Sequence, residues 1–108
     1  MTFLLSNAAK EDLADATEYY ESDSPGGGTR FLRRYETAVR RVLASPRGMP
    51  KYHWRTRICP IRRSDYGIVF RVIRKHVYVL GIICLIRHPS YWKPRAIDFS
   101  PKDFDNAD

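Results

Sequence analysis

The side chains in this sequence that can do chemistry are cations and a few proton carriers. Cleavage of RNA through its 2′-hydroxyl needs a group to take the hydroxyl proton, cations to stabilise the phosphorane-like charge, and a group to protonate the leaving oxygen. The candidate cations, on or beside predicted strands, are Lys51, Arg57, Arg63, Arg71 and Arg87. The candidate proton carriers are His53, His76, His88 and Tyr91. None of these proton carriers lies in a pattern that specifies catalysis, because the histidines fall in predicted loops and turns or precede a proline.

Arg71 is the most informative cation, because it interrupts an apolar strand between Val69 and Ile73. A guanidinium there must reach solvent, a carboxylate or a ligand, since burying it unpaired is costly. The simplest alternative is that its stem lies along the sheet and its head reaches the margin. Arg87 follows the next strand, and we expect it to converge with Arg71 if the two strands pair.

The stretch 66–86, YGIVFRVIRKHVYVLGIICLI, is the frame that must position these cations. Its Val, Ile, Tyr and Phe residues predict two strands that meet at Arg74-Lys75-His76. The first run alternates between two faces, and the second is almost continuously apolar, which indicates burial on both faces. We expect a tight antiparallel hairpin at the centre of the core.

Two amphipathic helices are predicted before the hairpin. Ser6 or Asn7 can cap the first helix, with Glu11 and Asp12 in or near its first turn, where the helix dipole favours negative charge. A glycine-rich loop separates the helices, and Thr29 can cap the second. The apolar stripe of the first helix is Ala9, Leu13, Ala16 and Tyr20, and that of the second is Phe31, Tyr35, Ala38 and Val42.

The remaining predicted strands complete an α+β fold. Residues 2–5 form a short opening strand, and residues 54–63 form a further strand that Pro60 places at an edge of the sheet. The order is strand, helix, helix, strand, strand, strand, with the helical hairpin packed on a mainly antiparallel four-stranded sheet. We predict a single domain over 1–95 and a C-terminal tail over 96–108 that is either docked or disordered.

The net charge of +7 is unevenly distributed. Residues 1–29 hold one lysine and six acids, residues 30–75 hold fourteen cations and two acids, and residues 76–108 are neutral. The central block, with a net charge of +12, favours an acidic macromolecular partner, either nucleic acid or an acidic protein. The alternative is an arginine-rich surface that is merely solvated.

The two cysteines, Cys59 and Cys84, lie in predicted strands and indicate buried thiols in a reducing compartment. Two cysteines make no credible zinc site, so we expect no metal and no cofactor. The longest apolar run, 77–86, is too short to span a membrane, and the N-terminus shows no secretory signal. These features predict a cytoplasmic protein without a membrane partner.

Several short strings recur on this frame in a specific order. A-x-x-D-L occupies 9–13, a pair of tyrosines follows at 19–20, S-P-G-x-G-x-R-F occupies 24–31, and prolines mark the helix exit at 46 and 50. The ending H-x-R-R-x-P-x-Y-W aligns with 84–92, where Cys84 replaces the usual histidine and Ile86 the first arginine. In this combination the chain resembles the RelE/ParE superfamily of bacterial type II toxins, most closely the ParE branch.

The resemblance implies a toxin of a plasmid-stabilisation type toxin–antitoxin system, held inactive in a hetero-oligomer by a cognate antitoxin. ParE toxins inhibit DNA gyrase, which is the expected target. One alternative is a RelE-type endoribonuclease that cuts mRNA on the ribosome, and another is a degenerate relative that only binds antitoxin. Because Cys84 and Ile86 replace the usual residues in what we expect to be a buried strand, the resemblance favours binding over catalysis. An open edge strand is expected to accept part of the antitoxin.

The resemblance also assigns expected site residues. The expected partner-binding residues are Arg33, Arg34, Arg41, Arg57, Arg63, Arg71, Arg87, Tyr91 and Trp92. For the ribonuclease alternative the catalytic set is Arg57, Arg71, Arg87 and Tyr91. In that alternative Arg71 and Arg87 would grip phosphate, whereas in the gyrase inhibitor they would pair with the antitoxin. Tyr91 and Trp92 have two interpretations, either an anchor that packs on the sheet or a contact with a partner.

Overall fold

The computed structural model describes residues 1–104, which form two helices packed on a sheet with a third, short helix on the other side. The sheet has four strands in the order β1-β4-β3-β2, with β1 parallel to β4 and the other pairs antiparallel. This confirms the predicted α+β class. The elements are β1 (Thr2–Leu5), α1 (Asn7–Asp23), α2 (Gly27–Ala44), β2 (Arg57–Pro60), β3 (Tyr66–Ile73), β4 (His76–Cys84) and α3 (Lys93–Ile97). Three single-turn 3₁₀ helices lie at Pro46–Gly48, Pro89–Tyr91 and Pro101–Asp103.

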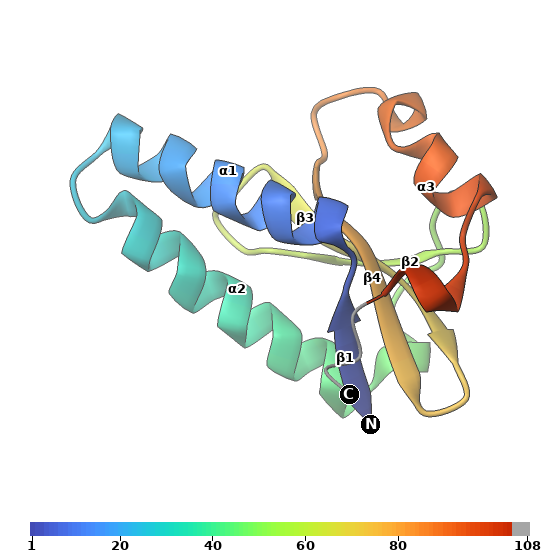
Figure 1. Ribbon diagram of the computed structural model, residues 1–108. Helices are drawn as coiled ribbons and strands as arrows, with labels where there is room; N and C mark the ends of the chain where they lie inside the picture. The colour runs from blue at the N-terminus through green and yellow to red at the C-terminus, as the bar shows by residue number, and fades with distance from the viewer. Residues whose placement is uncertain (105–108) are drawn as a thin grey trace.

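Figure 1 shows α1 and α2 side by side on one face of the sheet and α3 beyond the other. We call these the helical face and the outer face. Each face has its own apolar cluster, because β4 is buried on both sides. On the helical face the strands contribute Cys59, Ile68, Phe70, Val77, Val79 and Ile82. On the outer face they contribute Leu4, Ile58, Val69, Tyr78, Leu80 and Ile83.

The β3–β4 hairpin confirms the predicted centre of the core, with one irregularity that the sequence does not signal. Val69 pairs with Gly81 but Phe70 pairs with Val79, so Leu80 is an extra residue in β4. This bulge shifts the alternation of β4 by one residue. As a result Ile82, rather than Gly81, follows Val79 on the helical face.

The helix termini confirm one predicted cap and correct another. Ser6 caps α1, because its Oγ accepts a hydrogen bond from the Ala9 N–H at 3.1 Å. Thr29 is not a cap, since α2 begins two residues earlier after Gly26, whose φ of 80° suits glycine. A Cβ on Gly27 would overlap the carbonyl oxygen of Tyr20, so glycine at this position allows the two helices to approach closely.

Glu11 and Asp12 were expected in or near the first turn of α1, and they lie near it. No acidic residue lies in its first turn, because the helix begins at Asn7 and Glu11 and Asp12 fall in the next turn. Asp12 also points to the sheet, where its Oδ2 accepts a hydrogen bond from the Ile82 N–H at 3.1 Å. The helix dipole is therefore not the reason for an acid at position 12.

Strand β2 is shorter than predicted and its outer edge is partly closed. It spans Arg57–Pro60 rather than 54–63, because residues 53–56 form a tight turn. The expected edge position is confirmed. However, the Ile58 N–H donates to the Pro50 carbonyl, and the Pro60 carbonyl accepts from Arg41 Nη1. Proline also lacks a donor, so this edge is poorly suited to accept an added strand.

The segment after β4 folds back over the outer face. Trp92 is fully buried, Ala96 is 1% exposed and Phe104 is 8% exposed. Phe104 forms an isolated bridge with Ser6 and packs edge-on against Tyr78. Residues 96–104 of the predicted tail are therefore docked, and the rest of that tail lies outside the described residues. No helix within residues 1–104 is long and apolar enough to cross a membrane.

Tyr35 makes the stability of this fold depend on pH in the alkaline range. Burial, with a smaller effect of Glu36, raises its pKa from 10.0 to about 12. The pKa of Tyr35 is higher in the folded state than in the unfolded state. The contribution of its neutral phenol to stability is therefore complete below pH 10 and is lost as the pH rises toward 12. We expect the free energy of unfolding to fall across this window, and less steeply in Tyr35→Phe. Urea denaturation at several pH values measures the slopes, and identical slopes for the two proteins would contradict the expectation.

Candidate partner-binding surface

The predicted site residues form separate groups rather than one site. Arg71 lies opposite Tyr78 near the turn of the hairpin, whereas Arg87 follows Cys84, which pairs with Tyr66 at the other end of β3. Five residues of extended strand separate Arg71 from Tyr66, or about 17 Å. The expected convergence of Arg71 with Arg87 is therefore wrong, because Arg71 lies near the turn of the hairpin and Arg87 lies beyond the far end of β4.

Arg87 and Tyr91 form the first group. The Arg87 guanidinium carbon lies 3.8 Å from the centre of the Tyr91 ring, as in a cation–π contact. The Tyr91 hydroxyl accepts a hydrogen bond from the Cys84 N–H at 2.8 Å. Burial raises the pKa of Tyr91, which makes its hydroxyl a poorer proton donor at neutral pH. This phenol is better placed to anchor the chain after β4 than to transfer protons.

Arg71 lies under the C-terminal segment and binds backbone there. Its Nη2 donates to the Trp54 carbonyl at 3.2 Å and to the Ala96 carbonyl at 3.0 Å, and its guanidinium lies 4.6 Å from the Phe99 ring centre. Its Nε is buried and has no hydrogen-bond partner within residues 1–104. Burial, with a smaller effect of Arg55, lowers the pKa of Arg71. The guanidinium is therefore held in place rather than freely solvated.

A third group surrounds the tight turn before β2, and we call residues 51–57 the cationic turn. Its hollow, of about 390 Å³, is lined by Lys51, Tyr52, Arg55, Thr56 and Arg57. Arg57 Nη1 donates to the Met49 carbonyl at 2.7 Å, whereas Lys51 and Arg55 are exposed. The sequence had placed position 55 on a strand, so the hollow is a feature that sequence reasoning missed.

The predicted arginines of α2 lie on the helical side of the molecule. Arg33 is exposed, and Arg34 and Arg41 are half-buried near Arg62, where they line a small hollow of about 80 Å³. Arg63 is exposed in the turn after β2, with a left-handed φ of 57°. The expected partner-binding set is therefore spread over several surfaces, and each member remains a prediction.

Trp92 differs from the rest of that set, because its side chain is fully buried. It stacks on Tyr52 with ring centres 5.9 Å apart and meets Trp54 edge-on at 5.0 Å. A side chain without exposed surface offers nothing to a partner. In this structure Trp92 serves as the anchor, the first of its two interpretations.

Several sequence expectations about single residues need correction. Cys59 is buried as predicted, but Cys84 is only half-buried at the end of β4 and Ile86 is 77% exposed beyond it. His53 lies in a turn and His88 is exposed, as predicted. His76 is not a turn residue, because it is the first residue of β4. Within residues 1–104, no three His, Cys, Asp or Glu side chains are placed to hold a metal ion.

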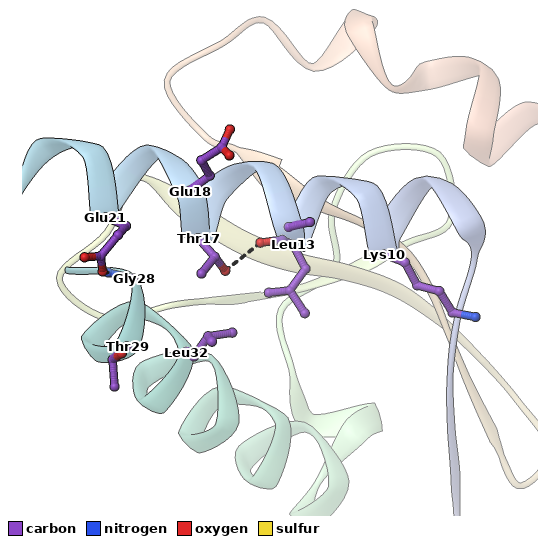
Figure 2. Close-up of a pocket in the computed structure, with 9 residues that line it drawn as sticks. Lys10, Leu13, Thr17, Glu18, Glu21, Gly28, Thr29 and Leu32 are labelled. Atoms are coloured by element: carbon purple, nitrogen blue, oxygen red, sulfur yellow. Dashed lines mark hydrogen bonds between the residues drawn. The ribbon is translucent and has the colours of Figure 1, made fainter. Parts of the chain in front are cut away.

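A second feature that sequence reasoning missed is an apolar cleft of about 600 Å³ between the helices. Figure 2 shows Leu13 from α1 and Leu32 from α2 pointing toward the same space. Glu21 closes one end, where its carboxylate accepts hydrogen bonds from the Gly26 and Gly28 N–H groups at 3.1 Å. The lining residues are Lys10, Leu13, Ala14, Thr17, Glu18, Glu21, Gly28, Thr29 and Leu32. Only the glycine run at 26–28 signals it in the sequence.

Comparison with known proteins decides the family. The sequence model described as the ParE toxin of the type II toxin–antitoxin system parDE matches residues 3–88. The chain belongs to the ParE toxin family. A solved structure of the chromosomal ParDE toxin–antitoxin system from P. aeruginosa has a similar fold, with a TM-score of 0.60 and 20% identity. The match covers 79% of this chain and 96% of that one. No curated protein matches this ParE-type toxin.

Proposed function

We propose that this ParE-type toxin acts by binding to DNA gyrase and is neutralised by a cognate antitoxin in a hetero-oligomer. The observation that carries the proposal is the match to the ParE toxin family over residues 3–88, which includes α1, α2, β2, β3, β4 and all but the first residue of β1. The toxin class follows from the family itself. The gyrase target and the antitoxin complex are the parts that experiment must test.

The geometry supports binding rather than RNA cleavage. The four residues of the ribonuclease alternative fall into two groups, with Arg57 and Arg71 toward one end of the sheet and Arg87 and Tyr91 at the other. General acid–base catalysis requires its groups within hydrogen-bond reach of one substrate. A separation of about 17 Å along the strand is too large for a single scissile phosphate.

The apolar cleft between α1 and α2 is the surface best suited to the antitoxin. A partner helix can lay an apolar stripe into such a groove, with Leu13 and Leu32 as the contact points. Arginines such as Arg33 and Arg40 are exposed on α2. They favour an acidic antitoxin segment, because opposite charges speed the encounter and fix the register.

The decisive experiment expresses the toxin without antitoxin and measures DNA supercoiling and translation separately. We expect supercoiling to be lost while mRNA remains intact. In vitro, purified toxin should stop gyrase from supercoiling relaxed plasmid. Cut mRNA with normal supercoiling would refute the gyrase target in favour of a ribonuclease. Normal growth together with a tight antitoxin complex would instead identify a relative that only binds antitoxin.

Repeating the assay with antitoxin tests the cleft. Leu32→Glu places a charge in the cleft, and the variant is expected to inhibit gyrase but escape neutralisation. Leu43→Glu is the matched control, since Leu43 is 38% exposed near the end of α2 and outside the cleft. If both variants are neutralised like the native protein, the antitoxin binds elsewhere.

A further inference from the structure

The cationic turn carries positive charge that the fold does not neutralise. Lys51, Arg55 and Arg57 line its hollow, and no acidic residue is among the lining residues. Within residues 1–104, none of these three cations forms a salt bridge with a carboxylate. Three like charges around one hollow repel each other unless an anion joins them.

Hydrogen bonds hold the cationic turn together, although its backbone is strained. Trp54 and Arg55 both have left-handed φ angles, 55° and 63°, which residues with side chains seldom adopt. The buried Thr56 holds this conformation, since its Oγ1 donates to the His53 carbonyl at 2.6 Å. The Tyr52 N–H also donates to the Thr56 carbonyl at 2.8 Å. Strain that the surrounding structure maintains is common at binding sites.

The positive charge continues from this hollow along the outer face. A second hollow of about 350 Å³ is lined by Trp54, Arg55, Arg71, Ala96 and Ile97, so Arg55 belongs to both hollows. The Lys93 ammonium lies 5.5 Å from the centre of the Trp54 ring. Cations therefore follow one another from Lys51 to Arg71 without an intervening acid in either lining.

Three consecutive aromatic rings lie between Lys51 and Arg55 in the sequence K-Y-H-W-R-T-R. The rings of Tyr52 and His53 are 4.6 Å apart, and those of His53 and Trp54 are 5.2 Å apart. His53 is exposed, and Tyr52 and Trp54 are half-buried. An acidic peptide would use the cations alone. A cationic hollow with aromatic rings beside it matches single-stranded nucleic acid, which offers phosphates and bases together.

We propose that the cationic turn binds the backbone phosphates of a single-stranded nucleic acid, with Lys51, Arg55 and Arg57 as the contacts and Arg71 further along the path. This site is independent of the gyrase proposal and of the apolar cleft between α1 and α2. It requires no cleavage, because Arg87 and Tyr91 lie at the other end of the sheet.

The test measures binding of a short labelled single-stranded oligonucleotide by fluorescence anisotropy over a range of salt concentrations. The double variant Lys51→Ala/Arg55→Ala should bind roughly 25-fold more weakly at about 0.1 M salt, and the slope of log affinity against log salt should fall by about 1.4. The control Arg30→Ala/Arg62→Ala removes the same charge from exposed positions on α2 and in the turn after β2, and it should bind like the native protein. Equal losses for the two double variants would overturn the proposal, because net charge alone would then explain the binding.

Arg55→Gly separates binding from folding. Glycine adopts a φ of 63° without strain, so the thermal midpoint of this variant should be at least that of the native protein, while its binding weakens about fivefold. Unchanged binding would overturn the proposal. Duplex DNA that binds as tightly as the single strand, or polyglutamate that displaces the oligonucleotide equally well, would also overturn it. No gyrase is present in this assay, so its failure and that of the gyrase proposal are distinguishable.

Discussion

Replacing Trp92 with alanine is expected to destabilise the protein by about 3–5 kcal/mol. Trp92 is fully buried and packs against Tyr52 and Trp54, so truncation leaves a large cavity in the outer-face cluster. Small domains have only about 5–15 kcal/mol of stability, so this loss removes a large fraction of it. Urea denaturation followed by circular dichroism measures the change.

Trp92→Phe is the matched comparison. The Trp92 indole N–H is buried and has no hydrogen-bond partner within residues 1–104. Phenylalanine removes this unsatisfied donor while it fills much of the space, so we expect a cost of only about 1 kcal/mol. A Trp92→Ala protein as stable as the native one, with weaker partner binding, would show that the residue is a contact instead of an anchor.

Breaking the ion pair between Asp12 and Arg95 is expected to have the second largest effect. Arg95 Nη1 lies 2.6 Å from Asp12 Oδ2 and also donates to the Leu80 carbonyl at 3.2 Å. The Asp12 side chain is 20% exposed and the Arg95 side chain is 28% exposed, so the cost of removing one partner is below that of a fully buried pair. We expect about 2 kcal/mol for Asp12→Ala, because the Ile82 N–H also loses its acceptor.

A double-mutant cycle isolates the pair. Asp12→Ala and Arg95→Ala should each destabilise, and the double variant should cost less than the sum of the two. Glu11→Ala is the control, because it removes an exposed acid next to Asp12. Lys10→Ala is not suitable as a control, since Lys10 lines the apolar cleft between α1 and α2. Strict additivity of Asp12→Ala and Arg95→Ala would show that the two groups do not stabilise each other.

Local patterns predicted the elements of this fold well. Alternation in β3 and the continuous apolar run of β4 correctly placed the central hairpin, and the apolar stripes correctly placed both helices. Patterns failed where a distant contact decides the outcome. The ion pair of Asp12 with Arg95 has no local signal, because the two residues are 83 positions apart in the sequence. The bulge in β4 and the turn that replaces the start of β2 have no local signal either.

The candidate site was harder to predict, because it depends on strand register. Arg71 and Arg87 were expected to meet, since their strands are adjacent, but the pairing of Tyr66 with Cys84 keeps them apart. For Trp92 the sequence allowed both an anchor and a binding contact, and only the fold, which buries the side chain, decides for the anchor. The apolar cleft between α1 and α2 was missed because a groove depends on the spacing between two packed elements, which local sequence patterns do not show.

The parallel pairing of β1 with β4 sets the order in which this protein can be completed during its synthesis. Thr2 pairs with His76 and Leu5 with Val79, so the first strand leaves the ribosome long before its partner exists. At about 5–20 residues per second, that interval is roughly 4–15 s. The contacts between α1 and α2 are local, and local contacts form early. The helical hairpin, with the apolar cleft between α1 and α2, therefore forms seconds before the sheet is closed.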